Sequence, residues 1–282
     1  MSESLGSIIF QKVEGGRVVL GTTKGGWIYA GQRPCYEAVL PTFFITEHPL
    51  TKDQVSSAMG APMPDDEAWM ETLSSLDVNE LATNLMASKA FQSFSNSHEG
   101  KWEIRCPTVA EWHRAKEEKR IHCVAGLTER LGDGPVNNHR GAMMDGRPRP
   151  NELLGPAANQ AAAMAIHPKN TDISAVGTVP FDRPLPNVVV RLVMSPIREA
   201  PAPRVPHKAD FWANLRSEAV WITLLGIVPS FLIPIARGMS DYATEGWFNL
   251  FFGGLCAGFF TGAFWRPNRP IIQFEDAEID RD

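Results

Sequence analysis

Two long apolar runs near the end of the chain dominate its hydrophobic pattern. Residues 219–236 and residues 246–265 contain no charged side chain. Each run is close to the roughly 20 residues that a helix needs to cross a bilayer. Because a helix pairs its own backbone polar groups, two such helices joined by a short turn can form a membrane hairpin. We expect a transmembrane helical hairpin over residues 219–265, with two buried helices of a soluble core as the alternative.

Before these runs, short apolar segments alternate with Gly pairs, a pattern that indicates strands and turns. It predicts strands over residues 7–13, 17–21, 27–31 and 36–45, and a closing strand over residues 187–195. Residues 126–186 are rich in Gly and Pro, and there we expect long irregular loops with one short helix over the Ala-rich residues 157–166. Such loops are typical of either a binding function or disorder.

Helix starts are marked by capping boxes, in which a Ser or Thr and a Glu or Gln three residues later satisfy each other's backbone N–H groups. Thr51 with Gln54 predicts a short helix, and Thr108 with Glu111 predicts another that ends near residue 120. Apolar residues at helical spacing predict a longer helix over residues 77–94.

The segment RCPTVAEWHRA at residues 105–115 resembles the RLPTEAEWEYA signature of the formylglycine-generating, sulfatase-modifying-factor family. Residues 43–55 and 188–196 are similar to that family's "VT..Q" and "GFR(L/V)V.S" segments, in the same order. The resemblance implies an α+β, C-type-lectin-like fold, with a small twisted sheet, two helices and much irregular loop. It implies a structural role, as the fold motif, for five residues: Arg105, Pro107, Thr108, Glu111 and Trp112.

The catalytic part of that family is missing from this chain. Its "GNVWEW" and "GGSW" segments and its paired reactive cysteines have no counterpart, since no cysteine lies between Cys123 and Cys256. We therefore expect a pseudoenzyme, with no catalytic residues, no metal site and no cofactor. A zinc site from Cys106, His113, His122 and Cys123 is a weaker alternative, because the spacing matches no standard ligand pattern.

Composition and charge complete the domain picture. A net charge of −5 argues against nucleic acid as a partner. Four widely spaced cysteines without a CxxC pair are typical of reduced thiols. We expect a cytoplasmic family-like domain at residues 1–200, a Pro-rich, basic linker at 201–218, the hairpin, and an acidic tail at 266–282. Lys and Arg flank both runs on the domain side, which predicts an integral protein of a cytoplasmic-type membrane with both termini cytoplasmic.

The second apolar run has two distinct faces. Gly254, Gly258 and Gly262 recur every four residues, and such small residues let a neighbouring helix approach closely. This ridge packs either on the first helix of its own hairpin or on another subunit. The Phe-rich opposite face is a candidate for contact with lipid, a partner helix or a pigment.

These observations predict a non-catalytic accessory subunit of a multisubunit membrane complex, with integral membrane proteins and lipid as partners. Among such complexes we favour bioenergetic ones, and a photosynthetic reaction-centre or light-harvesting assembly ahead of a respiratory one. A membrane-tethered sensor or ligand-binding module, with the loops of residues 126–186 as its pocket, is the alternative.

Overall fold

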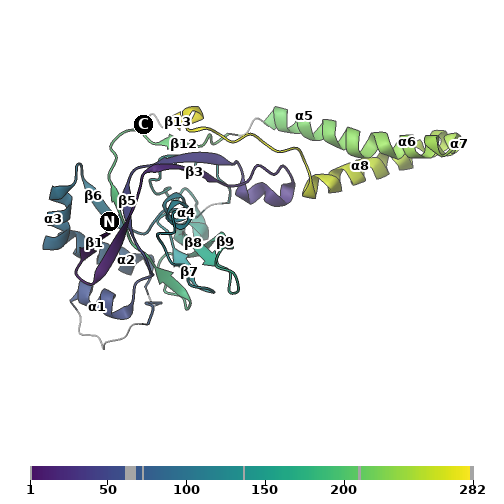
Figure 1. Cartoon of the computed structure of the whole chain (residues 1–282). Helices are drawn as coiled ribbons and strands as arrows, with labels where there is room; N and C mark the ends of the chain where they lie inside the picture. The colour runs from purple at the N-terminus through teal and green to yellow at the C-terminus, as the bar shows by residue number, and fades with distance from the viewer. Residues whose placement is uncertain (1, 61–67, 72, 136, 209–210, 280–282) are drawn as a thin grey trace.

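A five-stranded antiparallel sheet lies at the centre of the N-terminal part of the chain in the computed structural model (Figure 1). The structure describes residues 2–60, 68–71, 73–135, 137–208 and 211–279. The strand order is β1-β2-β5-β11-β6, so β11 from late in the sequence pairs between two early strands. The strands are β1 (Ser2–Leu5), β2 (Ile8–Val13), β5 (Phe43–Thr46), β11 (Val193–Pro196) and β6 (Trp102–Arg105).

Side chains of this sheet alternate between two apolar cores, one on each face. Phe43 and Ile45 of β5 belong to one core, and Phe44 between them belongs to the other. Val193 and Met194 of β11 divide in the same way. This is the two-residue period of a strand. The sheet is therefore covered on both faces, which fits the α+β class that the sequence predicts.

Helices cover one face, and a single helix with a second sheet covers the other. α1 (Lys52–Met59), α2 (Ser75–Ala87) and α3 (Lys89–Ser97) supply apolar residues to the first of these layers. α4 (Val109–Glu117) supplies Trp112, which is fully buried, to the second. The predicted capping boxes at the starts of α1 and α4 are present.

The prediction of a single helix over residues 77–94 is wrong, because two helices, α2 and α3, meet at Ser88. That residue has extended backbone (ψ 148°), and its hydroxyl accepts from the Phe91 N–H at 3.2 Å. Its own N–H donates to the Leu85 carbonyl. Ser88 therefore ends α2 and caps α3 at the same position, while the apolar stripe continues across the break.

Residues 126–186 hold most of a four-stranded sheet, which corrects the expectation of irregular loop. The Ala-rich residues predicted as a helix form a short 3₁₀ turn, η2 (Gly155–Asn159), and the buried strand β8. Ala162 and Ala163 are at most 1% exposed there. Pairing with a strand on each side, together with this burial, overrides the helix propensity of Ala. The sheet order is β10 (Val188–Val190), β7 (Thr128–Arg130), β8 (Gln160–Ile166) and β9 (Ser174–Pro180).

Two segments predicted as single strands each cross from one sheet to another. Residues 36–45 form β4 (Tyr36–Leu40), which pairs with β3 (Gly16–Leu20), and then β5 of the central sheet, with Pro41 between them. Residues 187–195 form β10 and then β11, with Arg191 between them. The strand predicted over residues 27–31 is instead the 3₁₀ helix η1 (Trp27–Gln32), which packs on the hairpin described next.

Two helices extend away from the domain as an antiparallel hairpin (Figure 1). α5 (Phe211–Ile222), a widened π-helical segment η3 (Thr223–Ile227) and α6 (Val228–Ala236) form one continuous helix of 26 residues. α7 (Ser240–Glu245) makes the turn, and α8 (Trp247–Phe264) returns over 18 residues. The first helix begins at Phe211, within the stretch that the sequence analysis assigns to the linker. The π segment ends two residues before Pro229, whose missing N–H interrupts the regular helical bonding.

The chain after α8 returns to the domain and completes it (Figure 1). The Ile272 N–H donates to the Cys35 carbonyl at 3.0 Å, and Phe274 packs on the core. The short strand β13 (Glu278–Ile279) pairs with β12 (Pro203–Arg204), and Val205 is fully buried. The globular part therefore includes segments that the sequence analysis assigns to linker and tail. Asp280 and Asp282 of the acidic tail lie outside the described residues.

Candidate functional site: the hairpin surface and the polar clusters of the domain

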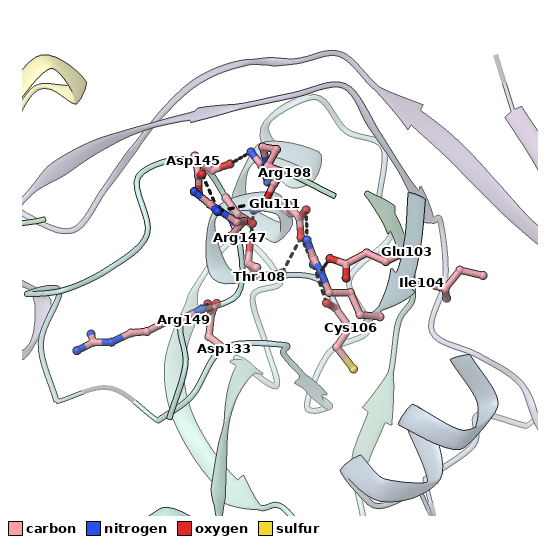
Figure 2. Close-up of polar contacts among 12 residues, drawn as sticks. Glu103, Ile104, Cys106, Thr108, Glu111, Asp133, Asp145, Arg147, Arg149 and Arg198 are labelled. Atoms are coloured by element: carbon pink, nitrogen blue, oxygen red, sulfur yellow. Dashed lines mark hydrogen bonds and ion pairs between the residues drawn. The ribbon is translucent and has the colours of Figure 1, made fainter. Parts of the chain in front are cut away.

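The five residues of the fold motif run from the end of β6 to the first turn of α4. Figure 2 labels two of them, Thr108 and Glu111. Arg105 donates two hydrogen bonds to the Glu111 carboxylate, at 2.7 and 2.9 Å. The Glu111 carboxylate also accepts a hydrogen bond from the Thr108 backbone N–H. In return, the Thr108 hydroxyl accepts one from the Glu111 backbone N–H. The buried Pro107 offers its carbonyl to the Gly132 N–H. Burial raises the pKa of Glu111, but the ion pair with Arg105 outweighs it and leaves the pKa lowered.

Trp112 connects this motif to a second buried ion pair. Its indole N–H donates to the Glu129 carboxylate at 2.8 Å, and Arg191 donates to both oxygens of the same carboxylate at 2.7 and 2.8 Å. Arg191 and Glu129 are fully buried. The remaining Arg191 N–H groups bond to the carbonyls of Thr46, Glu47 and His122. Every polar atom has a partner, so this cluster joins the two sheets and holds no substrate.

Asp133 is the buried carboxylate without a cationic partner in the described part of the domain. Its two oxygens accept from the Val109 and Arg149 N–H groups, each at 2.7 Å. Burial raises its pKa to about 6. Asp133 borders a cleft of about 480 Å³, whose other walls come from Cys106, residues 131–134 and residues 148–151. Part of the loop-rich region predicted as a pocket therefore does line a cleft.

The cysteine thiols of the domain are not placed as nucleophiles. Burial raises the pKa of Cys106 to about 12, and burial also raises the pKa of Cys35 and Cys123. An activated thiol needs the opposite shift. No group of three or more His, Cys, Asp or Glu residues that could hold a metal ion occurs among the described residues. The weighed zinc set of Cys106, His113, His122 and Cys123 is thus not assembled.

The glycine ridge faces the first helix of its own hairpin. A Cβ on Gly254 would lie 2.8 Å from Ile227 Cα, and one on Gly258 would lie 2.8 Å from the Ile222 carbonyl. Gly226 on the first helix makes a matching close approach to Gly254. Gly262 lies against the guanidinium of Arg266. Of the two alternatives for this ridge, the structure shows packing within the hairpin.

Large apolar side chains cover the outside of the hairpin. In the most apolar 18-residue stretch of the first helix only 6% is buried, and in the corresponding stretch of α8 only 17% is buried. Core helices of a soluble protein are mostly buried, so that alternative does not describe this hairpin. The following residues of α8 are 36–70% exposed: Phe248, Phe251, Phe252, Leu255, Phe259, Phe260 and Phe264.

An ion pair closes the base of the hairpin, and the sequence analysis missed it. Arg266 donates to Glu218 at 2.9 Å and to the Gly258 carbonyl at 3.1 Å. A signal for this pair was present, because Glu218 directly precedes the first apolar run and Arg266 directly follows the second. In an antiparallel hairpin these two positions face each other. The domain contributes η1 at the same level, where the Trp27 and Phe259 rings meet edge to face at 4.3 Å.

Comparison with known proteins yields distant fold likenesses only. No protein-family model and no curated protein matches the sequence. Among solved structures, PvdO from Pseudomonas aeruginosa has 11% identity and a TM-score of 0.48, covering 69% of this chain and 98% of its own. Treponema denticola variable protein 1 has 14% identity and a TM-score of 0.43 (70% and 99%). CarF has 15% identity and a TM-score of 0.39 (69% and 100%).

Proposed function

We propose that the hairpin crosses a lipid bilayer and anchors the domain to it. The observation that carries the proposal is the exposed apolar surface of the hairpin. Exposure of this surface to water is unfavourable, whereas contact with the hydrocarbon of a bilayer is favourable. At 1.5 Å per residue the two helices span about 39 and 27 Å, close to the roughly 30 Å of hydrocarbon. Both ends of the hairpin return to the domain, which supports a topology with the two termini on one side of the bilayer. The Arg and Lys flanks make that side cytoplasmic.

Extraction of membranes at alkaline pH tests the anchoring. The full chain should stay with the membrane pellet, and a matched variant with a Gly/Ser linker in place of residues 211–265 should be in the soluble fraction. Release of the full chain into the supernatant contradicts the anchor. Protease added to sealed, right-side-out vesicles should leave the domain intact, and its digestion contradicts the orientation.

Within the membrane, the protein acts as a non-catalytic accessory subunit of a larger complex. The buried Glu129–Arg191 cluster is internally satisfied and the thiols of the domain have raised pKa values, which favours a scaffold over an enzyme. The glycine ridge is occupied by the first helix, so the Phe-rich face of α8 is the surface left for a partner. Lipid, an integral subunit or the pigment of a bioenergetic, foremost photosynthetic, complex would fit an aromatic apolar face.

Native electrophoresis after mild solubilisation, with mass spectrometry of the co-migrating proteins, tests this assembly. We expect the full chain in a band well above its own mass together with integral subunits, and an absorption spectrum of that band reads out pigment. Migration as a free monomer contradicts the accessory role. Conversion of a sulfatase-type cysteine peptide to formylglycine by the purified chain, with Cys106→Ser as control, contradicts the non-catalytic assignment.

The cleft beside Asp133 favours a second candidate function, a membrane-tethered ligand-binding module. Its lining includes Asn79, Arg105, Asn151 and Gln160, which are polar groups suited to orient a small polar ligand. The two functions separate in one measurement. Saturable binding of a metabolite by the free monomer, weakened by Gln160→Leu, supports the binding module, whereas a stable complex with other subunits supports the accessory role.

A further inference from the structure

A polar pocket of about 280 Å³ lies where the hairpin meets the domain. Its walls come from η1 and the residues after it, from residues 138–140, from the first turns of α5 and from the segment after α8. Arg33, Arg140 and Arg269 contribute three guanidinium groups, and all three are half-buried. Glu218 is the carboxylate among the described lining residues. The pocket is therefore strongly cationic.

The positive charge of this pocket is not neutralised within the described part of the chain. Glu218 is already engaged by Arg266 at 2.9 Å. The three lining arginines donate instead to neutral oxygens: Arg33 to the Gly25 carbonyl at 3.0 Å, and Arg269 to the Asn214 side chain at 2.6 Å. Arg140 donates to the carbonyls of residues 206 and 208 at 3.2 and 3.1 Å. These bonds hold the guanidinium groups in position, and among the described residues no carboxylate pairs with their charge.

Mutual repulsion accompanies this arrangement. Burial first, and then the positive charges of Arg269 and Arg140, lower the pKa of Arg33, while Glu218 opposes the shift. An arginine stays charged at any physiological pH. The repulsion among these three groups is therefore present at any physiological pH, and a bound anion would offset it.

Tryptophans place the pocket at the level of the membrane surface. Trp27 lines the pocket itself. Trp221 and Trp265, from the two helices, meet edge to face at 5.5 Å, and Trp212, in the first turn of α5, is 71% exposed. Tryptophan prefers the headgroup region of a bilayer. The η1 helix of the domain contacts α8 at this same end of the hairpin (Figure 1).

We propose that this junction pocket binds the phosphate of an anionic phospholipid, with the acyl chains against the exposed apolar face of the hairpin. The inference rests on the proposed membrane anchor. Arginine forks match phosphate oxygens in pairs, and basic pockets beside membrane helices suit anionic headgroups. The bound lipid fixes the domain at the bilayer surface, because residues from the domain and from both ends of the hairpin share one headgroup.

Native mass spectrometry of the detergent-solubilised full chain tests the proposal with three probes: phosphatidylglycerol, phosphatidylcholine and inorganic phosphate. We expect retention of phosphatidylglycerol over phosphatidylcholine. Arg33→Gln and Arg269→Gln should each weaken retention of phosphatidylglycerol roughly fivefold. Arg33→Lys should weaken it less, because the charge stays while the planar fork is lost. Arg183→Gln, an exposed arginine of the domain, is the charge-matched control and should have no effect.

Two results overturn the lipid site. Equal retention of phosphatidylglycerol by the wild type and Arg33→Gln would show that the lipid binds elsewhere. Full displacement of the lipid by equimolar inorganic phosphate would show a free-anion site. The alkaline extraction separates this failure from failure of the anchor. A chain that stays in the membrane pellet but fails the lipid test keeps its proposed function and loses only this site.

Discussion

The domain and the hairpin are built on opposite rules. In the domain, apolar side chains fill two cores, and the charged pair Glu129–Arg191 is buried only because every polar atom is satisfied. In the hairpin, the interior is glycine and Ser230, and the large apolar side chains point outward. The first arrangement suits water as the surrounding medium. The second suits hydrocarbon, where close backbone packing, more than apolar burial, holds helices together.

The largest effect is expected when the chain is cut between the N-terminal domain and the hairpin. Truncation after Ala200 removes Val205 and the tail residues that pack on the core, and it should leave the domain unfolded. Replacement of residues 211–265 by a Gly/Ser linker keeps those residues and should leave the domain folded. Circular dichroism with thermal melting distinguishes the two variants. A cooperative melt of the truncated chain would show that the domain does not depend on its tail.

Removal of the cation in the buried pair is the next test. In the variant with a Gly/Ser linker in place of residues 211–265 (the linker variant), Arg191→Met leaves the Glu129 carboxylate buried without its partner. This should lower the free energy of unfolding by about 3–5 kcal/mol. Urea denaturation followed by tryptophan fluorescence measures it. Arg183→Met, at an exposed site, should cost under about 0.5 kcal/mol. Equal effects at the two sites would remove the contrast between a buried and a solvated charge.

The pH dependence of stability sharpens the role of buried charge in the domain. Burial raises the pKa of Asp133 to about 6 in the folded state, above its value of roughly 3.9 in the unfolded chain. Its contribution to stability is therefore present at low pH and is lost as the pH rises through about 6. Between pH 4 and 7 this loss is about 2 kcal/mol. The difference in unfolding free energy between the linker variant and its Asp133→Asn form should fall by that amount, and a difference that stays constant contradicts the shifted pKa.

The smallest effect is expected inside the hairpin. Gly254→Leu forces the two helices apart, because a Cβ there already meets Ile227 and Ser230. We expect a cost of about 1–2 kcal/mol. Gly253→Leu, on the next residue of the same helix, meets nothing within 4 Å and is the matched control. Unfolding of the full chain in mixed micelles with increasing SDS measures both. A Gly253→Leu variant as unstable as Gly254→Leu would mean that a large side chain anywhere on α8, and not close packing at the ridge, decides, because Leu has the higher helix propensity of the two residues.

Patterns that act locally were predictable from the sequence, and those that depend on tertiary neighbours were not. The capping boxes at Thr51 and Thr108 and the two apolar runs follow from residues a few positions apart. The strand β8 could not be predicted, because Ala162 and Ala163 become strand residues only through pairing with β7 and β9, which are distant from each other in sequence. The segment after α8 returns to the domain, where the Ile272 N–H bonds to the Cys35 carbonyl. No periodic pattern in the sequence predicts this contact.

The candidate sites divide along the same line. The motif at Arg105 and the glycine ridge were visible in the sequence as spaced residues, although the ridge's own partner was left open. The junction pocket was not visible, because Arg33, Arg140 and Arg269 come from three distant segments and meet only in the folded chain.

The return of the tail also sets an order on synthesis. A chain is made from its N-terminus, so both apolar helices leave the ribosome before Ile272, Phe274 and Ala277, which pack on the core of the domain. Although most of the domain is translated first, its core is complete only after the hairpin has been made. The domain therefore stays partly assembled until the hairpin and the segment after it have been translated.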